Sequence, residues 1–272
     1  RRDGLTRKTE EKRADARHEV ALPAPVTVVA GHGADALLYK DGMAWIMGDT
    51  GVSKIAADGA LQNLSPAPAG TRLILAQTAE GVLAVGSDGA VLIPAKGAPK
   101  TEKVNWKKEE VSANDAAIWG SGLYILDVPH NRILKFQSDG TNYGSPKPYL
   151  KDGTDLSTAA SIAIDGSVYF LSQSGRVDKL TKGAAEPFSL SPVEPAVIAA
   201  TRIRTSGDSD ALYVLEPSQQ RVLAYAKKDG RFLAQYANAS LKDVRDIAVD
   251  PMTRTLFAAT ANSVLKFSLP QQ

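Results

Sequence analysis

The sequence predicts an all-β fold: a six-bladed β-propeller of four-stranded antiparallel blades, closed by an N-terminal strand. Two segments 89 residues apart share one pattern, LYILDVPHNRILKF from Leu123 and LYVLEPSQQRVLAY from Leu212. In each, a short apolar strand ends in an acid, a polar turn follows, and a second strand opens with arginine. Weaker copies occupy the intervals, and a repeat of about 40 to 50 residues is typical of propellers.

Six short apolar segments mark the second strand of each predicted blade. Six units with four antiparallel strands each fit a six-bladed propeller. The segments start 39 to 45 residues apart, at Met43, Val82, Leu123, Val168, Leu212 and Leu256.

The fourth unit shows the strand order expected within a blade. An inner strand at residues 161–166 leads through a tight turn to a second strand at 168–171. A turn rich in Ser and Gly separates it from a third strand at 176–180. Residues 187–190 are the predicted outer strand.

The last unit has an inner strand at residues 246–250 and two further strands, but it ends without an outer strand. Two apolar stretches near the N-terminus, residues 19–22 and 26–30, are candidates for the missing strand. We expect one of them to close the ring, because pairing covers a sheet edge that would otherwise be exposed.

The composition is that of a globular chain with a large core. The 272 residues are 43% hydrophobic and 23% charged. The net charge of +2 makes no general case for a nucleic-acid partner. The absence of cysteine excludes disulfides, thiolate metal sites and cysteine catalysis. No apolar run is long enough to span a membrane.

We expect two regions, a charged linker or tail at residues 1–18 and the propeller at 19–272. The tail carries seven basic and four acidic residues and almost no apolar ones. It fits a solvated helix with i,i+4 pairs, a flexible linker, or a basic stretch beside an upstream membrane anchor. Because the chain begins with Arg1, we expect a fragment or a processed form.

Residues 123–140 (LYILDVPHNRILKFQSDG) resemble a blade of NHL-type propellers, and residues 212–230 (LYVLEPSQQRVLAYAKKDG) resemble it next best. The two N-terminal units lack the acid–arginine pairing. The C-terminal part is also similar to the propeller domain of bacterial membrane-anchored PP2C-like phosphatase-type proteins. This resemblance implies a location on the extracytoplasmic side of the cell envelope, tethered by segments upstream, and it implies no catalysis in this chain.

The repeated acids and arginines are predicted to form ion pairs across their turns, Asp127 with Arg132 and Glu216 with Arg221, because the arginine fork can grip a carboxylate. The alternative is that they contact a ligand on one face. Two acids after the inner strands, at positions 165 and 250, are predicted to stabilise turns. The predicted ligand-binding residues lie in the repeated turns, where propellers carry function. They are His130, Asn131, Gln219 and Gln220.

The sequence predicts no metal and no cofactor. Only three histidines are present, at positions 18, 32 and 130, and a zinc lyase would need several to converge. Asn114, Asp115 and Asn238 are candidate oxygen ligands for calcium, but no loop has fixed calcium spacing. Glycine-rich phosphate loops, GxSxG elbows and HExxH motifs are absent.

Single-stranded RNA binding is an alternative, because basic and aromatic residues could gather on one face. The balanced net charge and the aromatic content of 6% count against it. The residues in question are Lys107, Lys108, Lys135, Lys147, Lys151, Lys227, Lys228 and Arg231, with Trp106, Tyr143 and Tyr149.

The predicted function is that of a non-catalytic interaction domain in the cell envelope. Its loops or its central funnel would contact a protein, peptide or glycan partner, and a membrane would be reached only through segments outside this chain. A metal-assisted hydrolase or lyase at the funnel is the other alternative, beside RNA binding.

Overall fold

The computed structural model describes residues 19–49, 51–56, 58–66, 73–78, 81–86, 89–94, 100–102, 110–140, 142–151 and 153–270. The charged tail predicted at residues 1–18 lies outside these ranges. In the described ranges the elements are β-strands, apart from two 3-10 turns, η1 (Pro217–Gln219) and η2 (Ala239–Leu241). Within the described ranges, no helix is long and apolar enough to cross a membrane.

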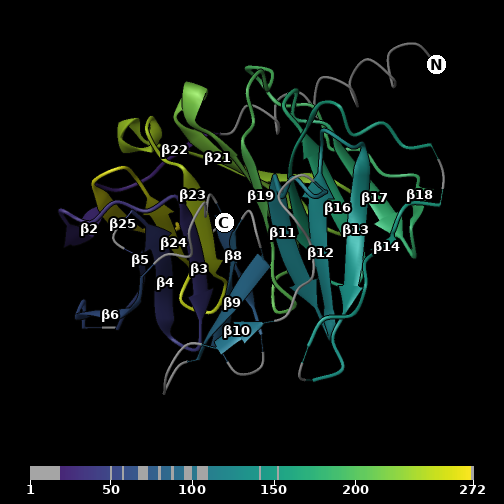
Figure 1. Ribbon diagram of the computed structural model, residues 1–272. Helices are drawn as coiled ribbons and strands as arrows, with labels where there is room; N and C mark the ends of the chain where they lie inside the picture. Colours follow the sequence, from purple (N-terminus) through teal and green to yellow (C-terminus); the bar gives the residue numbers. More distant parts are fainter. Residues whose placement is uncertain are drawn as a thin grey trace, which may run out of the picture.

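The strands of the described residues form six sheets, five of four strands and one of five. Each innermost strand contacts the innermost strand of the next sheet, and the last contacts the first. The chain is therefore an all-β propeller (Figure 1). The innermost strands are β3 (Ala36–Lys40), β7 (Leu73–Gln77), β11 (Asp115–Trp119), β15 (Ala159–Ile164), β19 (Arg202–Arg204) and β23 (Asp246–Asp250).

The second and third strands of each sheet follow the repeat closely, and each second strand starts within one residue of its predicted position. The second strands are β4 (Met43–Gly48), β8 (Gly81–Gly86), β12 (Gly122–Asp127), β16 (Val168–Ser172), β20 (Ala211–Glu216) and β24 (Thr255–Ala259). The third strands are β5 (Gly51–Ile55), β9 (Gly89–Pro94), β13 (Arg132–Gln137), β17 (Val177–Thr181), β21 (Arg221–Ala226) and β25 (Ser263–Ser268).

The outer strands include one that comes from the N-terminus. Strand β2 (Val26–Ala30) pairs antiparallel with β25 in the last sheet, and Figure 1 shows its purple arrow beside the yellow strands. Strand β1 (Glu19–Ala21) pairs instead with β22, in parallel, as a fifth strand of the preceding sheet. The other outer strands are β6 (Leu61–Ser65), β10 (Lys100–Glu102), β14 (Lys147–Pro148), β18 (Ala184–Glu186) and β22 (Phe232–Ala237).

The outer strand of the fourth sheet was predicted in the wrong place. It is β18, which ends at Glu186, and not residues 187–190. Lys182 and Gly183 both have positive φ, 52° and 84°, so a tight hairpin turn starts the outer strand at once. Pro187 then follows the strand, and proline has no N–H group to donate to the ladder.

The second strands are apolar over most of their length because both of their faces are buried. In β12, Leu123 and Ile125 pack with residues of the second sheet such as Leu83. Tyr124 and Leu126, which point to the other face, pack with residues of the fourth sheet such as Phe170. Successive side chains of a strand alternate between faces. One strand therefore joins two neighbouring cores.

Replacing Val29 by alanine is expected to lower the free energy of unfolding by about 2 kcal/mol, because Val29 of β2 is buried against Phe257 and Val264. The matched variant is Val26→Ala in the same strand, where the side chain is 64% exposed. It should change stability by less than about 0.5 kcal/mol. Urea unfolding measures the stability of both variants. Equal losses of unfolding free energy for Val29→Ala and Val26→Ala would contradict the packing of β2 against the last sheet.

Candidate functional site

A cavity of about 600 Å³ lies on the axis of the propeller. Its walls are the carboxyl-terminal halves of β3, β11, β15 and β23, joined by the loop that follows β19. Apolar side chains from each wall strand face it, among them Leu38, Ile118, Ile164 and Val249. These strands therefore form a pocket with a mixed apolar and polar lining, and its volume is within the size range of ligand sites.

Arg204 at the end of β19 forms the floor of this cavity. Its Nη2 lies 2.9 Å from Oδ1 of Asp246, and its Nη1 lies 3.4 Å from Oδ2 of Asp115. Nη1 also donates to Ser161 Oγ at 3.1 Å. Both carboxylates are buried. One guanidinium thus joins residues of four inner strands across the axis.

The same polar residues also tie three of the inner strands to the inner strand that follows. Asp115 accepts a hydrogen bond from the N–H of Ile162 in β15 at 2.9 Å. Ser161 accepts one from the N–H of Ile203 in β19 at 3.1 Å. Asp246 accepts one from the N–H of Leu37 in β3 at 3.0 Å. These bonds satisfy backbone donors that would otherwise be buried without a partner.

The floor keeps Arg204 charged. Burial by itself lowers the pKa of the guanidinium, but the charges of Asp246 and Asp115 outweigh burial and raise this pKa above its ordinary value. Two carboxylates face one guanidinium, so the floor carries one more negative than positive charge.

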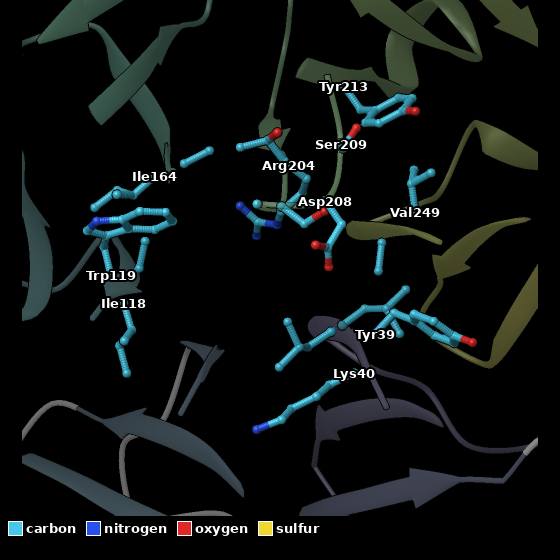
Figure 2. A pocket seen from close by; sticks show the side chains of 18 of the residues that line it. Tyr39, Lys40, Ile118, Trp119, Ile164, Arg204, Asp208, Ser209, Tyr213 and Val249 are labelled. Carbon is cyan, nitrogen blue, oxygen red and sulfur yellow. The ribbon is translucent and has the colours of Figure 1, made fainter. Parts of the chain in front are cut away.

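Polar and aromatic side chains surround the mouth of the cavity. Figure 2 shows Trp119 on one side, Tyr39 and Lys40 on another, and the carboxylate of Asp208 projecting inward. Trp119 is 45% exposed. Tyr39 stacks on Phe257 with ring centroids 5.1 Å apart. Burial, and then the nearby charge of Asp250, raise the pKa of the Tyr39 hydroxyl.

Both predicted acid–arginine pairs are present in the structure. Arg132 Nε donates to Asp127 at 2.8 Å, and Arg221 Nε donates to Glu216 at 2.8 Å. The two pairs differ in burial, since the side chain of Arg132 is 35% exposed and that of Arg221 only 2%. His130 also contacts Asp127 through Nδ1, at 2.7 Å.

The predicted ligand-binding turns lie at the other end of the strands from the cavity. Asn131 and Gln220 both have positive φ, 50° and 54°. The Asn131 side chain accepts from Leu156 N at 2.7 Å, and Gln219 donates to Ala196 O at 2.7 Å. Their contacts are therefore to neighbouring loops of the same chain, and a ligand at His130 or these residues stays a prediction.

The two acids that follow inner strands behave differently. Asp250 accepts from Met252 N at 3.0 Å and from the Thr253 hydroxyl, so its predicted turn role is confirmed. Burial raises the pKa of Asp250, but these hydrogen bonds outweigh it and leave the pKa lowered. Asp165 instead pairs with Lys227 of a neighbouring sheet at 2.5 Å.

The candidate calcium ligands are used within the protein. Asp115 belongs to the cavity floor, Asn114 accepts from Val128 N at 2.9 Å, and Asn238 caps η2 through Ser240 N at 2.9 Å. Across the described ranges, no three His, Asp or Glu side chains are grouped so that they could hold a metal ion.

No protein-family model matches the chain, and no curated protein matches its sequence. Solved propellers resemble it in fold. A gluconolactonase from Xanthomonas campestris superposes with a TM-score of 0.68 at 14% identity, over 94% of this chain and 92% of that one. The WD40 β-propeller domain of Doa1 gives 0.59 at 11% identity, over 92% and 97%. A chain of a nidogen/laminin complex gives 0.56 at 12%, over 76% and 80%. These likenesses show the β-propeller fold.

Of the residues at the cavity and its floor, the sequence singled out only Asp115, as a candidate calcium ligand. Asp246 was predicted only as part of an inner strand, and Arg204 and Asp208 carried no repeat signal. One clue was available: Arg204 lies in a short inner strand, RIR, whose outer positions are both arginine. A charged residue on a strand that must line the axis needs a charged partner there.

Replacing Arg221 by methionine should lower the free energy of unfolding by roughly 3–5 kcal/mol, because it leaves Glu216 buried without its cation. The matched variant Arg132→Met should cost clearly less, since Arg132 is partly exposed and Asp127 keeps His130 as a partner. Thermal and urea unfolding of both variants test this, and a larger loss for Arg132→Met would refute it.

Replacing Arg204 by methionine should also lower the free energy of unfolding by roughly 3–5 kcal/mol, since two buried carboxylates lose their shared cation. Arg202→Met on the same strand is the control, because Arg202 forms no ion pair with another residue of the described part of the chain. Arg202→Met should lower the free energy of unfolding by less than about 2 kcal/mol. Similar losses of unfolding free energy in the two variants would show that the ion pairs of Arg204 do not stabilise the protein more than the side chain of Arg202 does.

Proposed function

We propose that this protein is a non-catalytic binding domain whose central cavity receives part of a protein or peptide partner. The observation that carries the proposal is Trp119, an exposed aromatic side chain at the mouth of a 600 Å³ cavity with apolar walls. Ligand sites combine apolar walls with a few polar groups, and tryptophan is enriched among residues that dominate binding.

A protein partner agrees with the fold in general terms. One similar structure is that of a nidogen/laminin complex, and another is a WD40 domain. Because propellers host unrelated functions, this analogy supports the class of function and identifies no partner. A glycan that stacks on Trp119 is the other ligand class the cavity could accept.

The finer architecture belongs to the same proposal. Each of the six sheets would be one blade of an NHL-type ring, and β2 would close that ring in the sheet of β23, β24 and β25. The closed circle of inner strands and the β2–β25 pairing support it. Lost cooperativity in the Val29→Ala unfolding curve would support closure, whereas an unchanged curve would count against it.

The location rests on the resemblance to bacterial envelope proteins. The propeller would lie on the extracytoplasmic side of the cell envelope, tethered by segments upstream. Antibody labelling of intact cells tests this, and labelling that appears only after permeabilisation would refute it.

Selection of displayed peptides on the purified protein, with a glycan array in parallel, tests the binding site. Ligands selected on the natural protein should bind at least tenfold more weakly to Trp119→Ala. Ile198→Ala is the matched control, since Ile198 is a 69% exposed apolar residue that does not line the cavity. Ligands that are lost instead with His130→Ala or Gln219→Ala would place binding at the repeated turns.

The two alternatives have their own tests. A metal-assisted hydrolase or lyase would retain about one calcium or zinc ion per chain through dialysis, and elemental mass spectrometry measures this. Single-stranded RNA binding would appear as retention that weakens steeply with salt.

A further inference from the structure

We propose that the cavity binds a cationic side chain, a lysine or arginine carried by an exposed segment of the partner. This inference rests on the proposed function, because it names the chemistry of the group that enters the same cavity. It follows from the charges of the floor, the polar groups of the wall and the apolar surface between them.

The floor disfavours an anion. Arg204 is its one cation among the described residues that line the cavity floor, and Asp115 and Asp246 both contact it. Arg204 lines the cavity and its charge is already paired, whereas Asp115 and Asp246 are buried and do not line the cavity themselves. Together the three groups carry a net single negative charge. A carboxylate or phosphate brought there would lose hydration and meet this charge, whereas a cation would be attracted.

The wall supplies a carboxylate for that cation. Asp208 is exposed and points into the cavity, and it forms no hydrogen bond or ion pair with another described residue (Figure 2). The ammonium group of Lys40 is already bonded to the carbonyl oxygen of Thr78, with that of Gly81 at 3.4 Å. Hydrogen bonds between an ammonium or guanidinium donor and a carboxylate are among the strong ones in proteins.

The surface between the mouth and the floor fits the stem of such a side chain. Ile118, Ile164 and Val249 would contact the methylene groups, since lysine and arginine bury their stems along apolar surface. The exposed face of Trp119 would attract the charged head through a cation–π contact. A neutral sugar would use Trp119 but would gain nothing from the surplus negative charge.

The test uses three short probes, Ac-Ala-Lys-Ala-NH2, its norleucine counterpart and its glutamate counterpart. The reporter is the indole N–H signal of Trp119 in the full chain, assigned by its loss in Trp119→Ala. The lysine probe should shift this signal with an affinity about tenfold higher than the norleucine probe, as one charge-assisted hydrogen bond would give. The glutamate probe should be the weakest.

Asp208→Asn should remove most of the lysine preference. The matched control is Asp210→Asn, which makes the same charge change in the same loop at an exposed residue that does not line the cavity. It should leave the preference intact. The inference is overturned if the lysine and norleucine probes bind equally well, if the glutamate probe is preferred, or if no probe shifts the signal. It is also overturned if Asp208→Asn and Asp210→Asn have equal effects on the lysine preference. The peptide selection judges the proposed function separately, because it does not depend on charge.

Discussion

The ion pairs of Arg204 with Asp115 and Asp246 are the interaction on which the centre of this propeller depends. They join inner strands from three sheets, and the same carboxylates bind backbone N–H groups of the strands that follow. Charges buried in this way are stable only when every member keeps its partners. The circle of inner strands and the charge at its centre therefore stabilise each other.

This floor also decides what the axis of the protein can do. Because polar groups fill one end of the channel, the free space lies at the other end, where the inner strands finish. Apolar side chains face it from the wall strands, and its exposed side chains include Trp119, Asp41 and Asp208. The cavity therefore combines apolar contact area with a surplus of negative charge, which is the physical basis of both proposals.

The repeated acid–arginine pairs serve the opposite end of the sheets. Arg221 donates to the carbonyl oxygen of Pro195 at 2.6 Å, and Arg132 donates to that of Glu110. Each arginine thus joins its hairpin turn to the loop that enters the same sheet. The motif most visible in the sequence is a scaffold contact, which explains why it recurs in different sheets.

The sequence by itself determined the class of fold, the positions of the second and third strands and the ion pairs across the turns. Those features are local, since a strand pattern or a pair five residues apart, such as Asp127 and Arg132, is set by neighbouring residues. The outer strand of the fourth sheet was missed because two residues with positive φ, Lys182 and Gly183, shortened the turn. Only the tertiary structure decided the cavity, because Arg204 meets Asp115 across 89 residues of chain, and no local pattern records which distant strands converge on an axis.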